Sequence, residues 1–150
     1  MSIFTREIAS ENADRFGRLV SPGTFVALAL GTTLALWRRP RASRIALATL
    51  VATLASRVCK DAVPRRRPSW FTSDARRSFP SGHSAASTAY LVSTALTAPP
   101  RYRAFALALA ATGIAGVDAA RVVAHAHWPS DVLAGDALGL LSVAAASVPR

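Results

Sequence analysis

The stretch RVVAHAHWPSD, residues 121 to 131, organises the rest of the chain, because it sets polar groups between two apolar segments. It contains an arginine, two histidines, a tryptophan, a Pro-Ser pair and an aspartate, whereas alanine, valine and leucine dominate the flanking sequence. The apolar segments predict helices, so this stretch is expected to form the turn between them. Functional residues are often placed on such turns, which makes residues 121 to 131 the first candidate for a site.

Composition favours a membrane protein of one domain, residues 1–150. Hydrophobic residues make up 51% of the chain and charged residues only 17%, which is too apolar for an ordinary soluble protein of this length. A soluble helical bundle is the alternative, but it leaves too little polar surface to cover five long apolar runs. The runs cover residues 19–37, 45–56, 84–100, 104–117 and 132–149, and several are shorter than the roughly 20 residues of a typical spanning helix.

These runs predict an all-α fold, an integral membrane bundle of about five transmembrane helices. We expect the spanning helices at residues 19–37, 43–60, 83–99, 102–120 and 129–148, preceded by an amphipathic interfacial helix at residues 1–18. Residues 61–82 are rich in proline and arginine and predict an extramembrane loop, since proline interrupts a helix.

The net charge of +10 does not indicate nucleic-acid binding, because the arginines lie at the ends of apolar runs without a recognisable binding motif. Helix counting places residues 60–82 and 120–131 on one side of the membrane, opposite residues 38–44 and 99–103. Arginines occur on both sides, so the charge count alone leaves the orientation ambiguous. If the cations within residues 60–82 and 120–131 bind a ligand, they do not report orientation. The short Arg-rich connections at residues 38–44 and 99–103 are then cytoplasmic, and the site faces outward. The single Cys59 permits no internal disulfide.

Three groups of polar residues are expected to meet on the outward face. They are Lys60 and Arg67; Ser81, Gly82 and His83; and Arg121, His127 and Asp131. Lysine and arginine supply charge and donors to phosphate oxygens. A glycine at a helix start lets free backbone amides approach an anion. The three groups together predict a phosphate site.

The histidines suggest how such a site works. His127 and Asp131 are four residues apart, so in a helical turn the carboxylate can accept from one ring nitrogen and leave the other as a nucleophile. His83 can then protonate the leaving oxygen. The cations can offset the charge of a phosphoryl-transfer transition state, so no metal or cofactor is required. Spacing alone does not exclude a metal site, but no zinc signature is present.

These motifs resemble the type 2 phosphatidic acid phosphatase (PAP2) superfamily. Residues 60–68 read K-x6-R-P, residues 80–83 read P-S-G-H, and residues 121–131 read R-x5-H-x3-D, in the family's order. The resemblance implies that Lys60, Arg67, Ser81, Gly82 and Arg121 bind phosphate. It implies that His127 forms a phosphohistidine, that Asp131 orients it, and that His83 acts as acid and later activates water.

The expected function is therefore a membrane phosphatase that removes the terminal phosphate of a lipid phosphate or diphosphate. Candidate substrates are phosphatidic acid, phosphatidylglycerol phosphate, a polyprenyl diphosphate and a phosphorylated polyprenyl sugar, and we favour the polyprenyl lipids because their carriers are recycled at the outer face. The Ala- and Arg-rich composition suggests a GC-rich bacterial genome. The expected location is the bacterial plasma membrane, with the site facing the periplasm or exterior. Substrate choice and oligomeric state do not follow from the sequence.

Some residues leave alternatives open. The family usually has serine before the arginine of its third motif, whereas this chain has Ala120, which also fits a lipid-binding protein without turnover. A soluble acid phosphatase or a vanadium haloperoxidase of the same superfamily is a further alternative. His125 lies outside the pattern and is expected to line the pocket or to pack.

The last helix and the loop carry further expectations. Asp136 should face the bundle and pair with a cation or be protonated, because an unpaired charge in an apolar helix is costly. Gly135 and Gly139 are expected to permit close helix packing, within the bundle or between subunits, and we favour packing within the bundle. Aromatic residues are expected to enter the headgroup layer, namely Trp70, Phe71 and Trp128.

Overall fold

The protein is described by a computed structural model that covers residues 12, 15–17, 19–68 and 76–148. Five long helices account for most of this part: α2 (Pro22–Ala35), α3 (Ser43–Ala62), α4 (Gly82–Leu96), α5 (Pro100–Val123) and α6 (Pro129–Ser147). Within the described residues there is no strand, and one isolated bridge joins Arg65 to Arg77. The all-α prediction is confirmed.

Local sequence explains where the helices begin. Ser21 caps α2 by accepting from the Thr24 amide, and Ser81 caps α4 in the same way from the Ser84 amide. Proline occupies the first turn of α2, α5 and α6, where its missing N–H costs nothing. The first expected span was residues 19–37. The observed α2 is shorter at both ends: the Ser21 cap and Pro22 start it later, and it ends at Ala35.

Five transmembrane helices are not confirmed. By length and composition, α5 and α6 are the two described helices that are long and apolar enough to cross a membrane. The 14 residues of α2 reach only about 21 Å, against about 30 Å for a hydrocarbon core. In contrast, α3 has 20 residues but also carries four charged side chains, namely Arg44, Arg57, Lys60 and Asp61.

Helix α4 is the centre of the bundle and packs against α2, α3, α5 and α6. Its buried positions are mostly alanine and serine, and small side chains let neighbouring helices come close. The contact with α6 is the tightest: a Cβ added at Gly135 would lie 2.5 Å from the Ser81 carbonyl oxygen. At Gly139 the added atom would lie 2.8 Å from the Ala85 carbonyl oxygen. The prediction of close packing within the bundle is confirmed.

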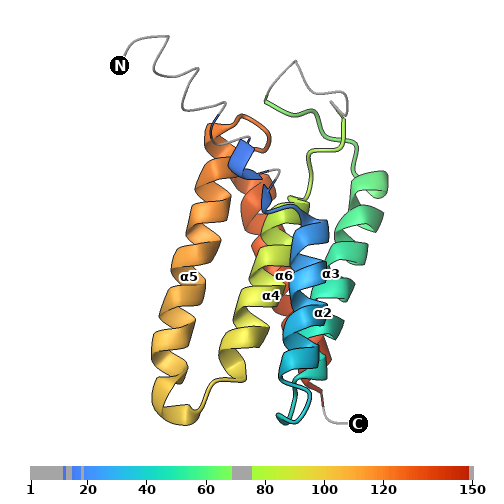
Figure 1. Cartoon of the computed structure of the whole chain (residues 1–150). Coiled ribbons are helices and arrows are strands. Elements are labelled where there is room, and N and C mark those ends of the chain that lie inside the picture. The colour runs from blue at the N-terminus through green and yellow to red at the C-terminus, as the bar shows by residue number, and fades with distance from the viewer. Residues whose placement is uncertain (1–11, 13–14, 18, 69–75, 149–150) are drawn as a thin grey trace.

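One end of the bundle gathers the residues singled out by the sequence. Figure 1 shows the loop between α3 and α4 and the connection between α5 and α6 at the same end, with residues 15–17 and 19–20 beside them. The connections between α2 and α3 and between α4 and α5 lie at the other end. The loop lies within the predicted extramembrane range, but α3 continues two residues beyond its predicted end, to Ala62.

The remaining expectations concern the N-terminal helix, two loop aromatics and Asp136. Of the proposed amphipathic helix, residues 12 and 15–17 are helical and the remainder lies outside the described residues, as do Trp70 and Phe71. Asp136 does face the bundle, where its partners are a hydroxyl and a second carboxyl group rather than a cation: Thr88 Oγ1 donates to Asp136 Oδ1 at 2.7 Å, and Asp118 is hydrogen-bonded to Asp136.

Candidate active site

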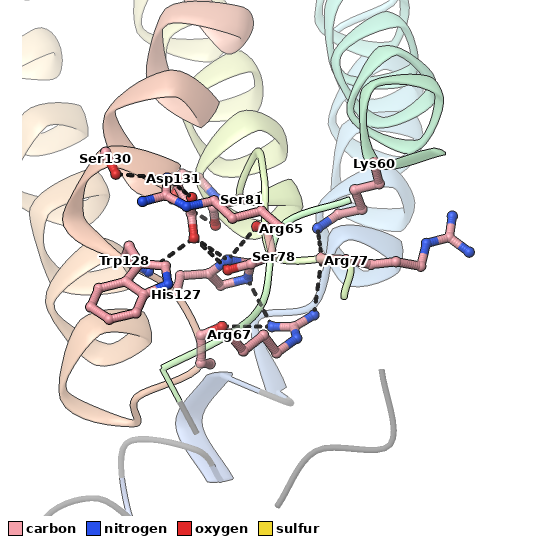
Figure 2. A network of polar contacts seen from close by, with 12 residues as sticks. Lys60, Arg65, Arg67, Arg77, Ser78, Ser81, His127, Trp128, Ser130 and Asp131 are labelled. Carbon is pink, nitrogen blue, oxygen red and sulfur yellow. Dashed lines mark hydrogen bonds and ion pairs between the residues drawn. The ribbon is translucent and has the colours of Figure 1, made fainter. Parts of the chain in front are cut away.

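His127 lies in the connection between α5 and α6 and is only 2% exposed. Its Nδ1 lies 2.8 Å from the main-chain carbonyl oxygen of Ser78, and a carbonyl only accepts, so Nδ1 carries the proton. The other ring nitrogen, Nε2, therefore holds a lone pair. Arg67 approaches it, with Nη1 at 3.3 Å from Nε2 (Figure 2). The ring thus presents a nucleophilic atom beside a cation.

Asp131 is fully buried at the first turn of α6 and has three donors. Arg65 Nη1 lies 2.6 Å from Oδ1, while Oδ2 accepts from the Ser78 hydroxyl and, at 2.9 Å, from the Trp128 amide (Figure 2). The distance from His127 Nδ1 to Oδ2 is 3.7 Å, which is within ion-pair range but too long for a hydrogen bond.

The expected direct hydrogen bond from His127 to Asp131 is therefore replaced by a contact through Ser78. The reason is where α6 begins. Its first residue is Pro129, so His127 precedes the helix and the helical relation between residues four apart does not apply. Asp131 instead accepts from the amide of Trp128, the residue that caps the helix.

Cations converge on the same place from three elements. At the end of α3, Lys60 Nζ donates to the Arg77 carbonyl oxygen at 2.9 Å, and from the loop Arg67 Nη1 donates to the Ala126 carbonyl oxygen at 2.7 Å (Figure 2). Arg121, in the last turn of α5, is buried. A Cβ added at Gly17 would collide with the Arg121 guanidinium, so Gly17 lies directly against this cation.

The start of α4 supplies the second histidine. His83 Nε2 lies 2.9 Å from the Gly17 carbonyl oxygen, and the His83 and His127 ring centroids are 6.5 Å apart. Ser81 is fully buried, and its amide donates to the Asp131 carbonyl oxygen at 2.8 Å. Gly82 has no room for a larger side chain without adjustment, because a Cβ there would lie 3.3 Å from Ser56 Oγ.

The charges around His127 affect its protonation. Its pKa is lowered from 6.5 to about 4: burial is the largest cause, Asp131 opposes the shift, and the positive charges of Arg67, Lys60 and Arg121 add to it. Because burial and neighbouring cations both penalise the imidazolium, the ring is neutral at pH 7. A neutral ring with its proton on Nδ1 is the form that a nucleophile at Nε2 requires.

All eight residues predicted from the sequence lie at this end of the bundle, whereas three further residues were missed. Arg65 is one of three consecutive arginines, and the sequence of this run does not distinguish it as a site residue. Ser78 lies two residues before the P-S-G-H motif, and Gly17 lies in the N-terminal segment, far from any motif. His125, which was expected to line the pocket or to pack, is exposed and has a left-handed backbone with φ of 51°.

Among the described residues, no three His, Cys, Asp or Glu side chains gather as a metal-binding group. Independence from metal remains a prediction.

Comparison with known proteins identifies the family. The sequence model described as the PAP2 superfamily matches residues 41–148, which is well over half of the chain and includes all eight predicted site residues. Gly17 lies outside the matched region. No curated protein and no solved structure gave a significant match. Given the extent of the family match and the order of its motifs, the chain belongs to the PAP2 superfamily.

Proposed function

We propose that this protein is an integral membrane phosphatase that hydrolyses the terminal phosphate of a lipid phosphate or diphosphate through a phosphohistidine. The observation that carries the proposal is the state of His127: its Nδ1 is held by a carbonyl, and its Nε2 faces Arg67. Membership of a family of phosphatases supports the reaction class.

The chemistry has two steps. Nε2 of His127 forms a bond to phosphorus while the bond from phosphorus to the leaving oxygen breaks, and His83 gives a proton to that oxygen. In the free protein, burial and the charge of Arg121 lower the pKa of His83 to about 3. His83 would therefore hold this proton when the negative charge of a bound phosphate raises its pKa. A water then attacks the same phosphorus and gives a proton to His83. The bond between phosphorus and Nε2 breaks, its electron pair returns to the ring, and inorganic phosphate leaves.

The remaining residues would hold the phosphoryl group. Lys60, Arg67 and Arg121 offset the negative charge that develops on the phosphate oxygens, and this stabilisation is often the largest contribution to catalysis. In the described structure Lys60 donates to the main-chain oxygen of Arg77, and Arg67 donates to the main-chain oxygen of Ala126. A bound phosphate would take over those donors. Ser81 and Gly82 at the start of α4 would add main-chain and hydroxyl contacts.

The apolar helices α5 and α6 support a membrane location. We propose a bacterial plasma membrane with the site on the periplasmic or outer face, where the phosphate of a lipid lies level with the end of the bundle. A polyprenyl diphosphate or phosphorylated polyprenyl sugar is the favoured substrate, with phosphatidylglycerol phosphate and phosphatidic acid as further candidates.

The test is phosphate release by protein purified in detergent, with a chelator present, on the four lipid classes. His127→Ala should abolish release, whereas His125→Ala, which removes an exposed histidine two residues away, should leave it within about twofold. Brief incubation with labelled substrate should trap an acid-labile, base-stable phosphoprotein. Equal release by wild type and His127→Ala on every lipid refutes the mechanism. Anionic-lipid binding without turnover would identify a lipid-binding protein instead.

A further inference from the structure

Ser78 contacts both His127 and Asp131, and it is fully buried. Its carbonyl oxygen accepts from His127 Nδ1 at 2.8 Å, and its hydroxyl donates to Asp131 Oδ2 (Figure 2). Because the histidine and the carboxylate are 3.7 Å apart, Ser78 provides the hydrogen-bonded connection between them. The position of the imidazole therefore depends on the position of one peptide group in the loop.

Arg65 holds the other side of the same carboxylate. Its Nη1 lies 2.6 Å from Asp131 Oδ1 and 2.8 Å from Ser130 Oγ, and its guanidinium lies over the Trp128 ring at 5.9 Å from the centroid. The main chain adds a further link, since the Ser78 amide donates to the Arg65 carbonyl oxygen at 3.0 Å. Arg65, Ser78 and Asp131 therefore form a closed ring of hydrogen bonds.

We propose that Arg65 and Ser78 are positioning residues for the reaction: Arg65 fixes the Asp131 carboxylate, and Ser78 transmits that position to His127. The inference rests on the proposed function of His127 as the nucleophile. Neither residue touches the reacting atoms in this scheme. Their effect is to hold Nε2 in line with phosphorus, where a misplacement of about 1 Å costs about a hundredfold in rate.

The chain offers matched controls for both positions. Arg66 adjoins Arg65 and has an exposed side chain, and its recorded contact is made by its carbonyl oxygen with Trp128 Nε1. Arg65→Gln and Arg66→Gln therefore remove the same charge from neighbouring positions. Ser142 is buried like Ser78, but its hydroxyl donates only to the Leu138 carbonyl oxygen of its own helix, so Ser142→Ala controls for losing a buried hydroxyl.

Kinetics with the best lipid substrate form the first test. Arg65→Gln and Ser78→Ala should lower kcat by about 10–100-fold, because a misplacement of the nucleophile by about 1 Å costs about a hundredfold in rate, and should leave KM within about threefold. Both controls should stay within about twofold of wild type. Arg65→Lys keeps the charge but not the forked geometry and should recover only part of the rate. Equal losses in Arg65→Gln and Arg66→Gln, or a rise in KM alone, overturn the positioning role.

A double-mutant cycle tests the connection through Ser78. If Asp131 acts through this residue, the Ser78→Ala/Asp131→Asn double variant should be no slower than Asp131→Asn alone. If instead the rate loss of the double variant equals the product of the two single losses, the carboxylate acts on His127 directly, and the inference is refuted. Circular dichroism of each variant in detergent shows whether it is folded before its rate is interpreted.

A measurement independent of turnover separates this inference from the proposed function. Histidine 15N NMR of wild type should show His127 neutral with its proton on Nδ1, and Ser78→Ala should shift the ring toward a mixture of tautomers. If wild type releases no phosphate, the proposed function fails, and the NMR result decides the inference alone. An unchanged His127 signal in both Ser78→Ala and Arg65→Gln overturns it.

Discussion

Gly135 offers the sharpest test of how the bundle holds the site together. A Cβ added there would lie 2.5 Å from the Ser81 carbonyl oxygen and 2.9 Å from Ser84 Cβ, where ordinary contact begins at 3.4 Å. Gly135→Ala must therefore push α6 away from α4 by several tenths of an ångström, because the main chain of α4 cannot rotate aside. Overpacking of this kind lowers the free energy of unfolding by about 1–3 kcal/mol. Each kcal/mol lost lowers Tm by about 2–4 °C in a protein of this size.

The displacement of α6 should also lower the catalytic rate. The start of α4 carries Ser81 and His83, and the start of α6 carries Asp131, so separating the helices moves the two halves of the site apart. Since a misplacement of about 1 Å costs about a hundredfold in rate, Gly135→Ala should lower kcat by about tenfold or more. Thermal unfolding in detergent and phosphate release measure the two effects.

Gly116→Ala is the matched control, because a Cβ at Gly116 in α5 meets nothing within 4 Å. Replacing a helical glycine at an open position should raise stability by about 0.5–1 kcal/mol, without changing kcat. If Gly135→Ala is as stable and as active as Gly116→Ala, the close approach of α4 and α6 does not hold the site, and the reasoning is refuted.

Three further predictions concern the site itself. The lowered pKa of His127 means that the neutral ring persists from pH 7 down to about 4, and that the nucleophile is lost as the pH falls through that value; an NMR titration of the free protein with a midpoint near 6.5 would contradict this. Gly17→Ala should displace Arg121 and raise KM for the lipid by about tenfold, whereas Gly23→Ala, whose nearest contact is 3.7 Å away, should not; equal KM values in both variants would refute the packing. Lys60→Met should weaken inhibition by inorganic phosphate by about 10–100-fold, since a hydrogen bond to a charged group contributes about 1.5–3 kcal/mol, and unchanged inhibition would remove Lys60 from the phosphate site.

Much of the fold follows from local sequence. Pro100 and Pro129 mark the starts of α5 and α6, and Ser81 marks the start of α4, because a missing amide or a capping hydroxyl acts within a few residues. The length of α2 was predicted less well. Ser21 and Pro22 are the same kind of local signal, but the apolar run continues on both sides of them, and the run by itself predicts a longer helix.

The sequence by itself determined the family, the helical class and the eight residues that meet at one end of the bundle, because motif spacing and apolar runs are properties of the chain alone. Only the tertiary structure decided which neighbouring residues form hydrogen bonds with them. His127 bonds to Ser78 rather than to Asp131, and Arg65 rather than Arg66 holds the carboxylate. A hydrogen bond depends on distance and angle, and spacing predicts these only inside a regular helix. His127 lies just outside α6, so its partners were set by how the loop packs against the helix ends.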